Sequence, residues 1–154
     1  MTSLKGGVAL VLLLGLLVSP GVIGGESMAN PNAPTKFGVT GLEEERGGPK
    51  CRAIIAPVKG GWSEPALFEW EPRAESWTDE HPHSEYNFVI EGHLFVESGG
   101  VTVEARAGDV VRVPPGVSGR YWSPVYARLL AIYGPSQGEP SKRVGYEKLT
   151  DKGE

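Results

Sequence analysis

The stretch HPHSEYNFVIEGHLFVESGGVTVEARAGDVVRVPPG, residues 81–116, carries most of the structural information in this 154-residue chain. Its apolar and aromatic runs are of strand length, and they are separated by Gly92, Gly99-Gly100, Gly108 and Pro114-Pro115-Gly116. Such runs between Gly and Pro turns are typical of antiparallel barrels and sandwiches. The same stretch holds all three histidines and several carboxylates, so any chemistry is expected here too.

Composition narrows the class of protein. The length suits one domain plus ends, and the 22 glycines and 13 prolines suit an all-β chain rich in tight turns. A net charge of −4 argues against nucleic acid or an anionic membrane surface as a partner, because both need clustered Lys and Arg. Cys51 is the only cysteine, which excludes an internal disulfide and a cysteine-based zinc cluster.

Residues 1–25 have the layout of a secretory signal: Lys5, an apolar run over residues 8–18, then Ser19-Pro20-Gly21. The run is shorter than the ~20 residues of a membrane span, but an uncleaved anchor is possible if it extends through Ile23. The prediction is therefore export or membrane anchoring. The alternative is that translation starts at Met28, which would make the protein cytoplasmic.

The rest of the chain divides into three segments that differ in composition. Residues 26–50 are predicted to be a linker or arm, residues 51–134 the β-domain, and residues 135–154 a solvated polar tail. About eight short antiparallel strands are expected in the β-domain, because closure into a barrel removes exposed edges. The runs that predict them are 52–58, 66–70, 75–78, 85–91, 93–97, 101–105, 109–113, 119–122 and 127–133.

Alternation within residues 85–91 separates two faces. Glu85, Asn87 and Val89 share one face, while Tyr86, Phe88 and Ile90 occupy the other. We expect the first face to line a pocket and the second to be covered by another sheet.

Two spaced motifs resemble those of the cupins. Glu85-x6-Gly92 is followed by Gly108-x5-Pro114-x-Gly116, and the resemblance extends over about residues 62–134. It implies a single-domain, RmlC-like cupin, which is a conical β-barrel also described as a double-stranded β-helix or jelly roll. The segments SEYNFVIEGHLFV, EARAGDVVRVPPG and SPVYARLLAIYGP are most similar to the ethanolamine-utilisation cupins and to those grouped with ureidoglycine aminohydrolase.

Cupins that bind metal place histidines in both motifs. Here Gly119 stands at the position of the second-motif histidine. His81, His83 and Glu85 are spaced to project from one face of a continuous strand, and such a set suits iron, manganese or zinc. Against this, Pro82 interrupts the two histidines, and both can instead lie on a solvated loop that binds nothing. A site without metal or other cofactor is the favoured prediction, and a divalent metal is the alternative.

Glu85 is the stronger candidate for chemistry. A carboxyl group inside a small barrel is desolvated, which raises its pKa and suits it to general acid–base catalysis. If Arg128 faces inward, as the family pattern implies, it could keep Glu85 ionised or bind an anionic substrate. Asn87 and Tyr121 could bind substrate through neutral hydrogen bonds. The alternative is a structural Glu85–Arg128 pair that joins neighbouring strands.

Three functions follow, and the residues leave open whether the chain is an enzyme. The favoured one is a small-molecule-binding cupin of the ethanolamine-utilisation type, in an accessory metabolic role and without metal. The resemblance implies ethanolamine breakdown, where relatives have been ascribed an acetate-kinase-like activity, although a cytosolic pathway conflicts with an export signal. The alternatives are a metal-dependent oxygenase, isomerase or hydrolase, and a non-catalytic exported binding or sensing protein. A homodimer formed through edge strands, with residues 26–58 as the pairing segment, is also expected.

Overall fold

A computed structural model describes residues 32–37, 41, 43–44, 47–138 and 140–149. The predicted signal or anchor over residues 1–25 and the alternative start at Met28 lie outside the described residues. The chain divides into two units, Met1–Thr35 and Lys36–Glu154, and the described strands all belong to the second. Within the part of the chain that is described, we find no helix with the length and apolar character needed to cross a membrane.

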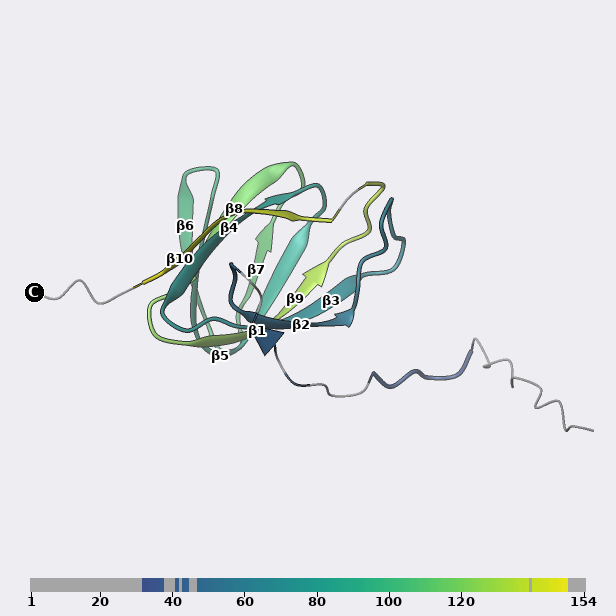
Figure 1. The fold of residues 1–154 in the computed structure, drawn as a ribbon, viewed down its shortest axis with the longest axis horizontal. Coiled ribbons are helices and arrows are strands. Elements are labelled where there is room, and N and C mark those ends of the chain that lie inside the picture. Colours follow the sequence, from purple (N-terminus) through teal and green to yellow (C-terminus); the bar gives the residue numbers. More distant parts are fainter. Residues whose placement is uncertain (1–31, 38–40, 42, 45–46, 139, 150–154) are drawn as a thin grey trace, which may run out of the picture. The chain divides into compact units, whose positions relative to one another are not determined.

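The second unit is all-β, as predicted, and its described residues form ten antiparallel strands (Figure 1). They are β1 (Glu43–Glu44), β2 (Lys50–Ile55), β3 (Ala66–Glu71), β4 (Glu75–His81), β5 (Glu85–Ser98), β6 (Val101–Arg106), β7 (Val110–Val113), β8 (Val117–Ser123), β9 (Ala127–Tyr133) and β10 (Lys142–Lys148).

Strand β5 joins the two layers of the barrel. Its first half pairs with β9 and β7, and continues the order β1-β2-β3-β9-β5. Its second half pairs with β6 and β8, and continues as β5-β8-β4-β10. The sheet therefore curls around β5 so that two layers face each other, which is visible in Figure 1. This is the jelly-roll arrangement expected from the sequence.

The bend that makes this possible lies at Gly92. The sequence predicted two strands, 85–91 and 93–97, with Gly92 as a corner between them. The structure has one strand with a register shift between Val89 and Glu91 and a positive φ of 74° at Gly92. A Cβ atom at Gly92 would lie 2.1 Å from the backbone oxygen of Tyr126. Glycine thus allows both the left-handed backbone and the close approach of the β8–β9 connection.

The two faces of β5 differ as their alternation predicts. Glu85, Asn87 and Val89 are buried. The prediction that a second sheet covers the opposite face is wrong, because Tyr86, Phe88 and Ile90 are 39%, 38% and 36% exposed. The second layer of the barrel packs instead on the face of β5 that carries Glu85. This is possible because β5 bends and its second half belongs to that second layer.

The ends of the domain are more ordered than their composition suggested. Part of the predicted arm, β1, pairs with β2, and part of the predicted solvated tail, Lys142–Lys148, pairs with β4 as strand β10. A register shift between Arg143 and Gly145 places an extra residue in β10. This bulge interrupts the period-2 alternation by which strands are found in a sequence.

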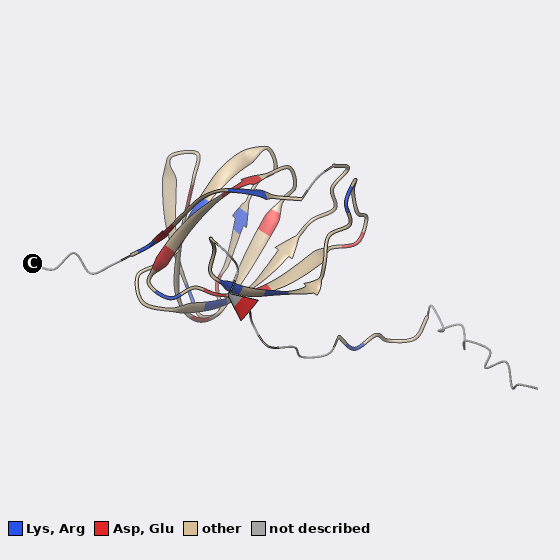
Figure 2. Cartoon of the chain, viewed as in Figure 1, with Lys and Arg blue, Asp and Glu red and all other residues tan. Residues whose placement is uncertain are grey.

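The interior combines aliphatic residues with a row of aromatic rings. Trp70 stacks on Trp77 with ring centroids 6.0 Å apart, and Trp77 stacks on Tyr121 at 5.3 Å. Acidic and basic residues are distributed over many of the strands (Figure 2), and some form pairs between strands, such as Arg120 of β8 with Glu147 of β10, 3.3 Å apart across β4. Trp70, at one end of the aromatic row, also lines a small cavity.

Replacing Gly92 with alanine tests the bend. Gly99 is a matched control, because it also has a positive φ of 59° but no heavy atom lies within 4 Å of the place that an added Cβ atom would take. We expect Gly99→Ala to lower the free energy of unfolding by about 1 kcal/mol, the cost of backbone strain alone. Gly92→Ala adds a backbone clash, so a loss of about 3 kcal/mol is expected. Urea denaturation measures both, and equal losses would contradict this account.

Candidate functional site

The two sequence motifs meet at one end of the barrel. Glu85 at the start of β5 lies opposite Val113, the last residue of β7. In the turn that follows, the amide of Gly116 donates a hydrogen bond to the carbonyl oxygen of His81, with a nitrogen–oxygen distance of 2.6 Å. The Pro-Pro-Gly turn thus fixes the end of β4 beside the start of β5, and the histidines and Glu85 are brought together.

A buried hydrogen-bond network surrounds the Glu85 carboxylate. Its Oε1 accepts from Asn87 Nδ2 at 2.9 Å, and its Oε2 lies 3.0 Å from His81 Nδ1 and 3.3 Å from Tyr121 Oη. Tyr121 Oη also lies 2.8 Å from His81 Nε2. All four side chains are buried. The structure therefore joins Glu85, Asn87, Tyr121 and His81, all of which the sequence singled out.

His83 extends this network through Ser141. The carbonyl oxygen of Ser84 lies 3.1 Å from His83 Nδ1, which places the ring proton of neutral His83 on that nitrogen. His83 Nε2 then accepts from Ser141 Oγ at 2.9 Å, and Ser141 Oγ can accept from His81 Nδ1 at 3.0 Å. Burial lowers the pKa of His83, so the neutral form is favoured.

These contacts define where protons reside. With its proton on Nδ1, His81 can donate to Ser141 Oγ or to Glu85 Oε2, each 3.0 Å away, while its Nε2 accepts from the Tyr121 hydroxyl. Burial, together with the nearby Glu85 carboxylate, raises the pKa of Tyr121 well above its ordinary value, so the phenol stays protonated. A carboxylate, an imidazole and a phenol in mutual contact can accept a proton at one atom and donate one at another. The site can therefore carry out acid–base chemistry or bind a polar ligand.

The absent second-motif histidine has a structural counterpart in Tyr121. A Cβ atom at Gly119 would lie 2.6 Å from Tyr121 Oη and 2.8 Å from its Cζ. The phenol thus fills the space that a side chain at position 119 would enter. It also bonds to His81, whose other ring nitrogen contacts Glu85. Among the described residues, no group of three or more His, Cys, Asp or Glu has the geometry of a metal site. His81, His83 and Glu85 are therefore not such a group in this structure, in which His81 Nδ1 lies 3.0 Å from Glu85 Oε2.

Arg128 does not join the site, and the predicted Glu85–Arg128 pair is wrong. Arg128 lies opposite Glu91 in the β9–β5 ladder, whereas Glu85 lies opposite Tyr133. Its guanidinium faces the outside of the sheet and pairs with Glu69 at 2.6 Å. Alternate residues of β9 are buried from Ala127 to Tyr133, so Arg128 belongs to the opposite face.

Glu69, the partner of Arg128, is the centre of a structural cluster. Arg52 bonds to the same carboxylate from β2. Burial would raise the pKa of Glu69, but the hydrogen bonds and charges of Arg128 and Arg52 outweigh it, so the pKa lies below its ordinary value. This is the kind of strand-joining ion pair that the sequence suggested, with a different carboxylate.

Sequence reasoning missed two members of the site. Ser141 bonds both histidines from the segment before β10, and a single serine in a polar tail carries no signal that could have identified it. Trp62 meets the His83 ring edge-on, with centroids 5.2 Å apart. Its Nε1 is buried without a hydrogen-bond partner.

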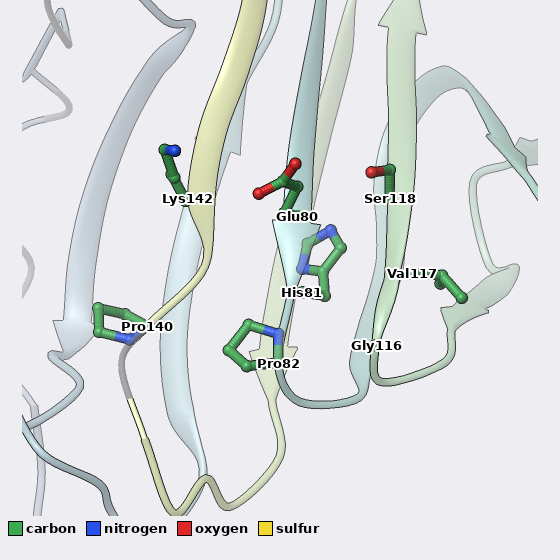
Figure 3. Close-up of a pocket in the computed structure, with 8 residues that line it drawn as sticks. All are labelled: Glu80, His81, Pro82, Gly116, Val117, Ser118, Pro140 and Lys142. Carbon is green, nitrogen blue, oxygen red and sulfur yellow. The ribbon is translucent and has the colours of Figure 1, made fainter.

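Two cavities border the network. A cavity of about 370 Å³ opens at the barrel mouth (Figure 3), where the His81 ring at the end of β4 lies on the side toward Ser118 of β8, and Lys142 of β10 lies opposite Glu80. It is lined by Glu80, His81, Pro82, Gly116, Val117, Ser118, Pro140 and Lys142. A second, of about 140 Å³, contains Ser141 and is lined mainly by aromatic and charged residues. Ligands therefore have two approaches to the network.

Comparisons with known proteins agree with this architecture. Residues 66–133 match the cupin domain family. A curated relative, acetate kinase EutQ of Salmonella typhimurium, is 29% identical over 83 residues, which are 54% of this chain and 35% of the relative. The chain thus spans about a third of that protein's length.

Solved structures show the same fold. An RmlC-like cupin from Shewanella frigidimarina has a TM-score of 0.54 and 26% identity, covering 68% of this chain and 94% of that one. A protein from Klebsiella pneumoniae with a double-stranded β-helix domain has a TM-score of 0.50 and 17% identity, covering 69% and 88% of the two chains. Residues 66–133 are thus similar in sequence and in fold to cupin domains. Among cupins the chain resembles EutQ.

The neutral His83 predicts a pH dependence. Because its folded-state pKa is lowered, the unfolded state takes up the proton first as pH falls below about 6.5. The stability advantage of the wild-type protein over His83→Gln should therefore shrink from pH 7.5 to pH 5.5. Urea denaturation at a series of pH values measures this difference. His93→Gln serves as the matched control, because it removes a histidine whose side chain is 52% exposed. The account is contradicted if the His83→Gln difference stays constant or grows.

Proposed function

We propose that this protein is a small-molecule-binding cupin that works without a metal and uses Glu85, His81 and Tyr121 as its acid–base centre. The observation that carries the proposal is the position of the Tyr121 hydroxyl, which lies where a side chain at position 119 would project and bonds to His81 at 2.8 Å. The similarity to EutQ supports an accessory metabolic role of the ethanolamine-utilisation type.

The contacts assign a role to each side chain. Glu85 accepts a proton from the ligand, directly or through His81, whose Nδ1 it contacts at 3.0 Å. Tyr121 stabilises negative charge that develops on a ligand oxygen by donating its hydroxyl proton in a hydrogen bond. Asn87 holds the other carboxylate oxygen of Glu85 and so fixes the direction of proton transfer. If no ligand is turned over, the same donors and acceptors make a binding site.

Metal analysis combined with a single-atom change tests the proposal. Protein purified without chelators should contain well below one metal ion per chain by elemental analysis, as should His81→Ala and His83→Ala. Tyr121→Phe should abolish the thermal shift produced by a bound polar metabolite, because it removes one hydroxyl and keeps the ring. Tyr126→Phe is the control, since that hydroxyl bonds to Glu71 away from the network. Stoichiometric metal that is lost in both histidine variants would establish the metal-dependent alternative instead.

The relative's name suggests a second candidate, acetate kinase activity. The similarity over 83 residues supports it. Formation of acetyl phosphate from acetate and ATP, trapped as the hydroxamate, tests it directly, with Glu85→Gln as the comparison. Activity that depends on Glu85 would make the protein an enzyme of that class. A thermal shift with a metabolite but no turnover would favour the binding or sensing function.

A second copy of this chain is the partner we propose for the outer face of β5. Arg112 lies at one end of this face, with its guanidinium 5.8 Å from the centre of the Tyr86 ring, and Glu91 lies at the other end. A two-fold axis between them would bring opposite charges together around an apolar centre, as an isologous interface requires. The exposed apolar side chains of that centre are Tyr86, Phe88, Ile90 and Val110.

Phe88→Glu tests this interface. We expect the wild-type protein to be a dimer by light scattering, and Phe88→Glu to weaken the dimer by more than about thirtyfold, because a charge replaces an apolar contact at its centre. Val101→Glu is the matched control, since Val101 is exposed on β6 in the other layer. A monomeric wild-type protein, or a dimer that Phe88→Glu leaves intact, would contradict the proposal. The second outcome would favour pairing through the edge strands.

A further inference from the structure

The smaller cavity has the composition of a cation site. It occupies about 140 Å³ under β10, and aromatic rings of Phe68, Trp70 and Tyr133 form its walls. Asp79 contributes a carboxylate whose side chain is only 6% exposed. Aromatic ring faces attract cations through their quadrupole, and a buried carboxylate adds a full negative charge. Together they provide an environment that favours a positively charged group.

A cation of the protein itself already occupies this environment. The guanidinium carbon of Arg143 lies 5.2 Å from the centre of the Trp70 ring, and Arg143 Nε lies 3.4 Å from Asp79 Oδ1. Its side chain is 18% exposed, so it reaches the cavity from the surface. The β10 bulge directly follows Arg143, which lies opposite Asp79 in the β10–β4 ladder. Bulges commonly redirect a side chain at functional sites.

We propose that this cavity binds a small organic cation, an ammonium or guanidinium compound, which takes the place of the Arg143 head group. Arg143 then competes with the ligand from within the same chain. The bound ligand would contact the Trp70 ring and the Asp79 carboxylate in the way that Arg143 does in this structure. The stem of Arg143 enters from the rim of the barrel, so withdrawal of the side chain toward solvent opens the cavity without unfolding β4.

This inference goes beyond the proposed function and names the class of ligand. The cavity shares Ser141 with the hydrogen-bond network, and Tyr133 stacks against His83 with centroids 4.9 Å apart. A cation bound there lies next to the acid–base centre. Binding itself relies on Trp70 and Asp79 and not on Glu85. Calorimetric binding of a cation therefore tests this cavity separately from the acid–base proposal, which can fail without affecting it.

Competition predicts a specific pattern of affinities. The apparent affinity of the wild-type protein is reduced by the fraction of molecules in which Arg143 fills the cavity. Removing the guanidinium while keeping a polar side chain, as in Arg143→Gln, removes that competition. Arg120 is a matched control, because its guanidinium lies 5.1 Å from the Trp122 ring centre and 3.3 Å from Glu147, but it is 47% exposed and borders neither cavity.

Titration with methylguanidinium chloride, at constant ionic strength maintained with sodium chloride, measures the effect by calorimetry. We expect saturable binding to the wild-type protein and binding at least tenfold tighter to Arg143→Gln. Arg120→Gln should match the wild-type protein. Adding Asp79→Asn to Arg143→Gln should weaken binding at least tenfold, because the buried negative charge is lost.

The inference is overturned if Arg143→Gln binds the probe no more tightly than the wild-type protein, or if Asp79→Asn leaves the affinity unchanged. Near-ultraviolet circular dichroism establishes that the variants fold. Should Arg143→Gln not fold, the wild-type protein provides the test. A saturable shift of the Trp70 indole NMR signal by methylguanidinium, but not by sodium, supports the site, and its absence overturns it.

Discussion

The burial of the Glu85 carboxylate is the constraint on which this site depends. A carboxylate removed from water is costly unless its oxygens are hydrogen-bonded. Here Asn87 donates to Oε1, and His81 Nδ1 and Tyr121 Oη lie 3.0 Å and 3.3 Å from Oε2. Each donor requires something of the fold: β4 must end beside β5, β8 must lie across the cavity, and position 119 must lack a side chain. Gly119 therefore does more than omit a metal ligand, because it makes room for the phenol that bonds to Glu85 and His81.

The carboxyl-terminal part of the domain completes the same site. Strand β10 pairs beside β4 at the edge of the sheet. Ser141, just before it, bonds to both histidines, and Arg143 faces Asp79. Farther along, Tyr146 and Lys148 bond to Glu75 with distances of 2.7 Å each. The later part of β10 is thus held to β4 by side-chain hydrogen bonds, while Lys142 and Arg143 at its start line the two cavities.

Much of the fold could be predicted because glycine and proline mark the turns. Gly92, Gly108 and Gly116 each have positive φ in the structure, and the motif spacing at these positions predicted the cupin-like barrel. Alternation also placed Glu85 and Asn87 inside. It could not decide the face of Arg128, because ARLLAIY is apolar at both parities, and the inward placement of Arg128 that the family pattern implies is wrong. Ser141 and β10 escaped because the bulge hides the strand period and pairing with β4 is a long-range contact.

The buried carboxylates of this barrel differ in the charge of their partners. That difference distinguishes a carboxylate with a structural role from those with a proposed chemical role. Glu69 is held by two guanidiniums on the outer face, and its lowered pKa keeps it ionised as a strand-joining pair. Asp79 faces the Arg143 guanidinium at a cavity, which makes that partner exchangeable for another cation. Glu85 bonds to an imidazole, an amide and a phenol, all of which can be neutral. The imidazole and the phenol carry exchangeable protons, whereas a guanidinium keeps its own. Proton transfer is therefore expected at Glu85, and cation exchange at Asp79.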